Sequence, residues 1–168
     1  MDHKTLSRKN FLSIAGFGTA NLLFAAPVFS VAQQPAKAPV ALDPALVHDF
    51  VLNAHANLDK VKELFKKEAG LLNASWDWGG GDFETAMEAA GHMGRKDIAQ
   101  FLLDNGGRIN LFCSAMLGKL DIVKSTLTAF PDLKDSKGPH GLQLIHHATK
   151  GGEDAKAVLD YLKSIGAK

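Results

Sequence analysis

The chain has 168 residues, of which 46% are hydrophobic and 22% are charged. These proportions fit one compact domain and argue against a disordered, collagen-like or polytopic membrane protein. Residues 1–32 hold three of the 19 basic residues and one of the 18 acidic ones, so 16 basic and 17 acidic side chains remain after them, a net charge of −1. A nearly neutral chain of this kind is unlike nucleic-acid-binding proteins, which need clustered positive charge.

Residues 1–32 are predicted to be a signal peptide. A basic start at Lys4, Arg8 and Lys9 precedes the uncharged stretch 11–32, which ends in the small residues that a signal peptidase recognises. We therefore expect a periplasmic or secreted protein, with no membrane contact once this segment is removed. An uncleaved anchor is the alternative, because about 20 uncharged residues can also span a bilayer.

The segment Ser7-Arg8-Lys9-Asn10-Phe11-Leu12 resembles the twin-arginine export signal, whose pattern is S-R-R-x-F-L. Lys9 replaces the second arginine, so export by the general secretory route remains open. Residues 33–42 contain two prolines in a short polar run and are predicted to be an extended linker. The folded domain is accordingly expected to span residues 43–168.

The folded part is predicted to begin with a helical hairpin. Asp43 and Pro44 are typical of an N-cap and a first-turn proline, and residues 48–56 are expected to form the first helix. Asn57 is expected to form a left-handed turn, since asparagine is the usual substitute for glycine in that conformation. The second helix is then expected over residues 58–65.

A more regular hairpin is predicted over residues 85–110. Thr85 and Glu88 have the spacing of a capping box, in which each side chain bonds to the backbone amide of the other residue. Gly94 is expected to supply the left-handed turn between the two helices. The second helix carries apolar residues at helical spacing and is expected to end at a glycine: Ile98, Phe101, Leu102 and Gly106.

Two further hairpins are predicted downstream. Their turns and apolar positions repeat those of the preceding unit, with loops of different length between units. The residues concerned are Gly118, Leu127, Phe130 and the helix-ending Pro131 in the third unit, and Gly151, Val158, Leu159, Leu162 and Ile165 in the fourth.

The repeated pattern resembles the ankyrin-repeat family, whose units read T-P-L-H-x-A-A, a glycine turn, V/I-V-x-x-L-L and then G-A-x-x-N. The resemblance covers residues 43–168 and is most specific over residues 85–110. It implies an all-α fold, a solenoid of about four stacked helix-turn-helix units, because one unit cannot bury its own apolar face. It further implies a monomer without catalytic activity or cofactor that binds another protein through its concave face and loop tips.

The loop between the first two units, residues 73–84, contains both tryptophans of the chain beside three consecutive glycines. Exposed aromatic rings gain nothing unless they are covered. Two interpretations remain open: the rings of Trp76 and Trp78 fold back onto the repeats, or they anchor a protein partner. The candidate partner-binding residues are Trp76, Trp78 and Phe83.

The histidines offer an alternative function. His140, His146 and His147 lie close together in the sequence, near Asp135 and Glu153, so a small metal-binding protein or enzyme that uses this region is the alternative prediction. His146 coincides with the histidine of the ankyrin motif, whose ring usually bonds to neighbouring backbone groups. Three other histidines show no spacing typical of metal ligands: His48, His55 and His92.

Cys113 is the only cysteine of the chain, so neither an intramolecular disulfide nor a cysteine zinc site can form. Its apolar neighbours predict a buried thiol. No catalytic triad order, phosphate loop or paired-carboxylate motif stands out. We therefore assign no catalytic, cofactor-binding or metal-binding residue from the sequence.

Overall fold

The computed structural model describes residues 40–168, so the predicted signal peptide and residues 33–39 of the predicted linker lie outside the described residues. Within the described range the chain forms eight α-helices, four 3₁₀ helices and two short strands. This part of the protein is therefore mostly helical, as predicted. Among its helices, none combines the length and the apolar character needed to cross a bilayer.

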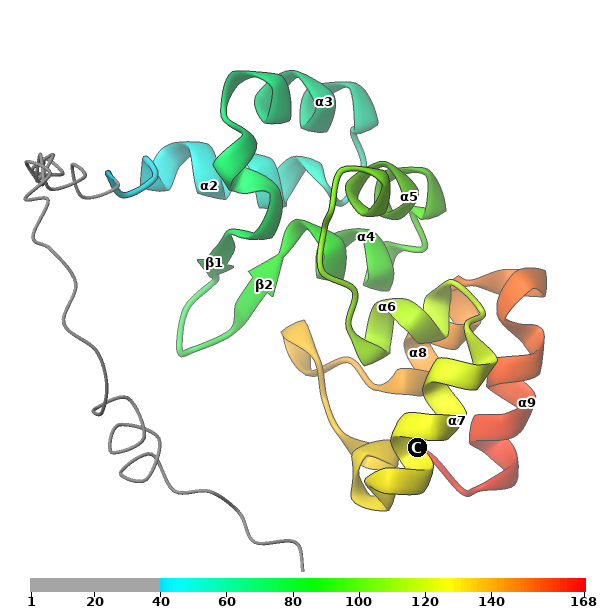
Figure 1. Ribbon diagram of the computed structural model, residues 1–168. Helices are drawn as coiled ribbons and strands as arrows, with labels where there is room; N and C mark the ends of the chain where they lie inside the picture. The colour runs from blue at the N-terminus through cyan, green and yellow to red at the C-terminus, as the bar shows by residue number, and fades with distance from the viewer. Residues whose placement is uncertain (1–39) are drawn as a thin grey trace, which may run out of the picture. The chain divides into compact units, whose positions relative to one another are not determined.

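The α-helices follow one another as four consecutive pairs (Figure 1). Within each pair the two helices pack against each other. The pairs are α2 (Pro44–Asn53) with α3 (Leu58–Lys67), α4 (Ala86–Met93) with α5 (Lys96–Asp104), α6 (Leu111–Met116) with α7 (Leu120–Ala129), and α8 (Leu144–Lys150) with α9 (Lys156–Ser164).

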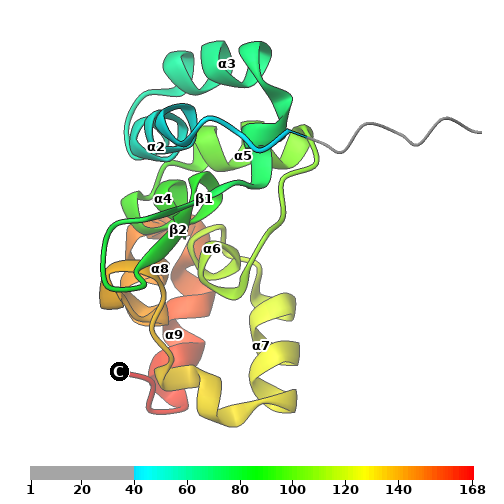
Figure 2. The ribbon, with the colours of Figure 1, turned by 90° about the vertical axis from the view of Figure 1, so that its left-hand side faces the viewer.

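The pairs pack on one another through their first helices. The first helices contact each other in succession, α2 with α4, α4 with α6 and α6 with α8, and α3 contacts α5 as α7 contacts α9. Figure 2 shows α2 and α3 at one end and the pairs α6–α7 and α8–α9 side by side at the other, where α4 contacts α8 as well as α6. Short 3₁₀ helices lie in the connections: η1 (Ala69–Asn73), η2 (Pro131–Asp135), η3 (Pro139–Gly141) and η4 (Gly152–Ala155).

Apolar side chains between the helices form two buried clusters. One cluster includes Phe50, Ile98 and Leu102 from the first two pairs. The other includes Leu144 and Leu162 from the last pair. All five side chains are fully buried, and burial of each contributes about 1.5–3 kcal/mol. The predicted apolar face of the second unit is therefore confirmed at Ile98 and Leu102.

The predicted apolar face of the third unit is only partly buried. Leu127 is 4% exposed, whereas Phe130 is 63% exposed. The prediction for Phe130 is wrong because α7 ends at Ala129 and the chain then enters η2 at Pro131. The aromatic ring consequently leaves the helical face on which its sequence spacing would place it.

Two predicted helix caps are confirmed. Asp43 accepts the N–H of Ala45 at 2.9 Å, and α2 begins at Pro44, four residues earlier than predicted, because the cap and the proline initiate it directly. Thr85 and Glu88 form the predicted capping box, in which the Glu88 carboxylate accepts the N–H of Thr85 at 2.8 Å. Both starts depend on local side-chain to backbone bonds.

The turns between helices agree with the prediction in part. Gly94 has a φ of 75° and provides the expected left-handed turn. Asn57 does not, because its side chain instead caps α3 by accepting the N–H of Lys60, with a φ of −123°. In the fourth pair, Gly151 has a φ of −70° and the positive φ of 61° falls one residue later, at Gly152.

The loop between the first two pairs contains a short antiparallel hairpin that the sequence did not predict. Strand β1 (Ser75–Asp77) pairs with β2 (Phe83–Thr85), and the register sets Trp76 opposite Glu84. The Asp77 carboxylate accepts two backbone N–H groups of the glycine turn, at 2.8 and 3.2 Å. In Figure 1 this hairpin extends from the side of the helices.

The close packing of the turns gives a test of the stack. Gly118 has a φ of 69°, and a Cβ atom there would collide with the carbonyl oxygen of Asp154. Gly106 has a φ of 87° but open space around it. We expect Gly118→Ala to lower the free energy of unfolding by about 3 kcal/mol, and Gly106→Ala by about 1 kcal/mol, the cost of a left-handed alanine. Urea unfolding measures both losses, and equal losses would contradict the close approach.

Candidate functional site

The three residues predicted to bind a partner do not share one surface. Trp76 and Trp78 are half-buried against the N-terminal core cluster, and the His48 ring meets them edge-on, at centroid distances of 5.0 and 5.5 Å. Phe83 is 59% exposed. The tryptophans therefore pack in the way that the first interpretation of the loop describes, and partner binding by Trp76, Trp78 and Phe83 stays a prediction.

Glu84 points away from solvent, because successive side chains of a strand point to opposite faces. Its side chain is 0% exposed, and Trp78 donates its indole Nε1–H to Glu84 Oε2 at 2.8 Å. Burial raises the pKa of this carboxyl, but the close approach of the His92 ring, the indole N–H of Trp78 and the nearby His55 ring together outweigh burial, so that the pKa is lowered overall. Glu84 is thus a buried carboxylate anion.

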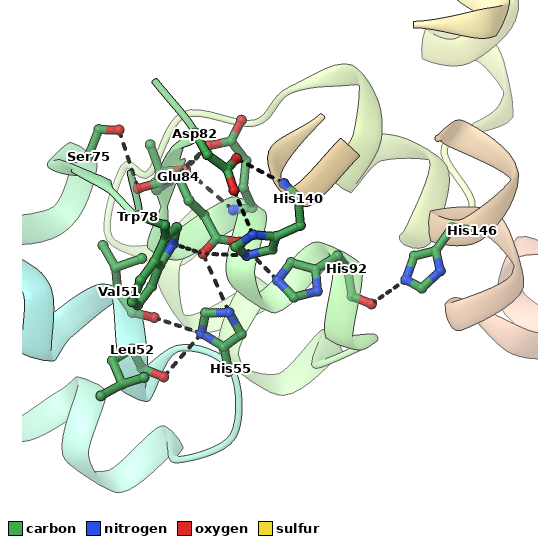
Figure 3. Close-up of polar contacts among 12 residues, drawn as sticks. Val51, Leu52, His55, Ser75, Trp78, Asp82, Glu84, His92, His140 and His146 are labelled. Atoms are coloured by element: carbon green, nitrogen blue, oxygen red, sulfur yellow. Dashed lines mark hydrogen bonds and ion pairs between the residues drawn. The ribbon is translucent and has the colours of Figure 1, made fainter. Parts of the chain in front are cut away.

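Three histidines from separate parts of the chain surround this carboxylate (Figure 3). His55 lies in the turn after α2, His92 on α4 and His140 in η3. The Nε2 atom of His92 lies 2.9 Å from Glu84 Oε1, and the Nε2 atoms of the other two each lie 3.4 Å from Glu84 Oε2. The same nitrogen of all three rings therefore faces one buried anion.

Hydrogen bonds on the far side of two rings fix their orientation. His55 Nδ1 lies 3.1 Å from the carbonyl oxygens of both Val51 and Leu52. His140 Nδ1 lies 2.8 Å from Asp82 Oδ2. Carbonyl and carboxylate oxygens only accept hydrogen bonds, so each of these Nδ1 atoms carries a proton. The Nε2 atoms that face the buried carboxylate are the remaining positions for a ligand or a second proton.

The backbone of His140 is held in an unusual conformation. Its φ of 57° and ψ of 19° make it the one non-glycine residue with a positive φ in the described part of the chain, a conformation that costs about 1–2 kcal/mol. The His140 N–H donates to Asp82 Oδ1 at 2.9 Å, and this bond is the main cause that lowers the pKa of Asp82. Asp82 thus binds both the backbone and the ring of His140.

The four side chains have the composition of a metal site. His55, Glu84, His92 and His140 each offer one ligand atom, and these atoms lie within 4.8 Å of one another. Among residues 40–168 this is the one such group of histidine, cysteine and acidic side chains. Hydrogen bonds from ligating rings to carboxylate or carbonyl oxygens, as at His55 and His140, are typical of metal-binding histidines.

The histidine region predicted from the sequence is divided in the structure. His140 joins the cluster, but His146 bonds through Nε2 to the backbone oxygen of His92 at 3.0 Å, as the ankyrin resemblance implied for that position. His147 is fully buried and lies outside the cluster. The two acidic residues expected near them are also outside it: Asp135 and Glu153.

The sequence did not identify Glu84, His55 or His92 as a site. They belong to different helical pairs or to the hairpin between them, so no short spacing relates them. One local signal was present: aromatic and acidic residues alternate over residues 76–78 and 82–84, which is typical of strands with two different faces.

The predicted burial of Cys113 is confirmed. Its side chain is fully buried, with the sulfur 3.5 Å from that of Met87. Burial, aided by the charge of Glu88, raises the pKa of the Cys113 thiol to about 12. A thiol that stays protonated at neutral pH is a poor nucleophile and a poor metal ligand.

The comparisons with known proteins assign no role to these residues. No model of a known protein family matches the chain, and no curated protein matches it. The chemistry of the site is therefore inferred from the side chains themselves.

Because Trp78 bonds to the buried Glu84 carboxylate and Trp76 does not, substitutions of the two tryptophans should differ in their effect on stability. Trp78→Phe removes the indole N–H that bonds to Glu84, and loss of a donor to a buried anion is expected to lower the free energy of unfolding by about 2 kcal/mol. Trp76→Phe is the matched control, since Trp76 is half-buried against the same cluster; it should cost less than about 1 kcal/mol. Urea unfolding compares the two, and an equal cost would argue against a stabilising bond.

The burial of His147 predicts an acid-sensitive fold. Burial lowers the pKa of His147 to about 4, from an ordinary 6.5, so the unfolded chain binds the proton more readily than the folded one. The stability is then complete above pH 6.5 and falls as the pH drops toward 4, by about 2 kcal/mol between pH 7.5 and pH 5.

The matched variant for this prediction is His147→Phe, which cannot titrate. The carbonyl of Gln143, which bonds to the His147 ring, keeps its backbone bond from the N–H of residue 147. Urea unfolding at the two pH values should show a smaller acid loss in the variant by about 2 kcal/mol. The same acid loss in both proteins would assign the sensitivity to other groups.

Proposed function

We propose that residues 43–168 form an ankyrin-type stack of helical hairpins that binds another protein. Three features support this proposal: the consecutive helix pairs, the left-handed glycine turns at Gly94 and Gly118, and the packing of first helix on first helix. Repeat stacks of this kind present an extended surface to a partner. If the predicted signal peptide directs export, the partner is a protein of the same compartment.

The observation that carries the proposal is the position of Phe83. Its ring is 59% exposed, while the hairpin that bears it is held from the other side by the bond between Trp78 and Glu84. An aromatic side chain on a rigid support loses little conformational freedom on binding. Buried aromatic anchors contribute much of the affinity of protein interfaces.

The surroundings of Phe83 indicate what kind of segment would bind. A shallow groove of about 290 Å³ runs beside it, with Phe112 and Pro139 as apolar walls and three charged lining residues: Asp82, Glu88 and Lys137. An apolar side chain of the partner would pack on the two phenylalanine rings. Polar groups next to it in the partner would meet the three charged side chains, and such complementary charges favour one binding orientation over non-specific apolar contact.

Substitution of Phe83 tests the proposal. The tagged full-length chain is produced in its own host, and proteins cross-linked to it are quantified by mass spectrometry. Phe83→Ala should reduce the recovery of the specific partner about tenfold or more, because a central aromatic anchor is lost. Its melting temperature should change little, since the ring is mostly exposed.

Phe130→Ala is the matched control. Phe130 is 63% exposed but lies at the end of α7 and outside the groove. This variant should recover the partner as the unsubstituted chain does. Equal recovery with Phe83→Ala, or no stoichiometric partner with any of the three chains, would contradict the proposal.

A further inference from the structure

We propose that His55, Glu84, His92 and His140 bind a divalent transition-metal ion, and that Zn²⁺ is the ion whose preferences they fit. This proposal is independent of partner binding at Phe83. It differs from the metal site predicted from the sequence, since it shares with that prediction only His140.

The first argument comes from the positions of the ring protons. His55 and His140 carry a proton on Nδ1, because that atom faces carbonyl oxygens in one ring and the Asp82 carboxylate in the other. A neutral ring of this form directs the lone pair of Nε2 outward. Both lone pairs then face Glu84 Oε2 at 3.4 Å. A cation between these atoms turns a repulsive arrangement into an attractive one.

The second argument comes from buried atoms without a hydrogen-bond partner. Glu84 Oε1 and His92 Nε2 are both fully shielded from solvent and neither has a hydrogen bond, although the two atoms lie only 2.9 Å apart. They approach each other without the alignment that a hydrogen bond requires. Unsatisfied buried polar atoms are costly, and a shared metal ion would satisfy both of them.

The spacing of the ligand atoms fits an ion after a small adjustment. Zinc bonds of about 2.0–2.2 Å in a tetrahedron place the ligand atoms about 3.3 Å apart. The four ligand atoms lie within 4.8 Å of one another. The proposal requires the His140 ring, which is 33% exposed and the most accessible of the four side chains, to shift inward when the ion binds. It is also the side chain through which an ion can enter.

The chemistry of the ligands narrows the choice of ion. Three imidazoles and one carboxylate suit zinc and its transition-metal neighbours, whereas calcium and magnesium prefer oxygen ligands. Four protein ligands are typical of a zinc ion that holds structure, since catalytic zinc sites keep one position open. The ion would therefore tie the end of α2, strand β2, helix α4 and η3 together.

The test uses the purified full-length chain, treated with a chelator and then titrated with zinc chloride by calorimetry at pH 7.5. We expect one Zn²⁺ per chain. Saturation at 100 times the dissociation constant should raise the melting temperature by about 10 °C, because the ion binds only the folded state. Magnesium and calcium chloride should produce neither binding heat nor a shift.

Two histidine variants distinguish this site from casual zinc binding. His140→Gln removes a ligand and should weaken zinc binding about 100-fold. His48→Gln is the matched control, because its side chain is 36% exposed, against 33% for His140, and it is not one of the four ligands. Asp82→Asn, which weakens the support of His140 without removing a ligand, should weaken zinc binding about tenfold.

No stoichiometric zinc binding, or equal zinc affinity in the His140 and His48 variants, would overturn the proposal and leave three histidine rings packed around the buried Glu84 carboxylate. Zinc binding that depends on His140 but not on His48 would establish the site, whatever the partner-capture experiment shows.

Discussion

The structure depends on the packing of neighbouring helical pairs, because no single pair can bury its own apolar face. The α-helices of the described chain are short, with six to ten residues each, and isolated helices below about 12 residues are marginal in water. Helix α6 illustrates the consequence. It places Cys113 and Met116 in one buried cluster and Ala115 in the other, so the two halves of the stack are stabilised through one helix.

This packing also brings the polar site together. The stack sets α4 beside α2 and close to α8, and a loop residue that precedes α8, His140, meets Asp82 of the hairpin. Glu84 can then be buried as an anion because donors and histidines from three segments surround it. A buried carboxylate without such neighbours would be strongly destabilising.

The hairpin connects the two proposals. Strand alternation places Glu84 inside, among the histidines, and leaves Phe83 outside, beside the groove. The contacts of Glu84 on the buried face hold the strand backbone that carries the exposed Phe83 ring. One short element can therefore support a binding surface on one face and a metal site on the other, and each function is testable without the other.

The sequence by itself determined the local features of this fold. The caps at Asp43 and Thr85, the turn at Gly94 and the burial of Ile98 follow from side chains and backbone within a few residues of one another. Asn57 shows the limit of such local prediction. Asparagine suits both a left-handed turn and a helix cap, and in this structure Asn57 caps α3.

Only the tertiary structure decided the site. His55, Glu84, His92 and His140 lie in separate elements, and nothing in the spacing of their positions relates them. Their meeting depends on how one helical pair is stacked on the next and on how the Asp82 bonds hold the His140 loop. The physical reason is that caps and turns are set by neighbours in the chain, whereas a ligand cluster is set by packing between distant segments.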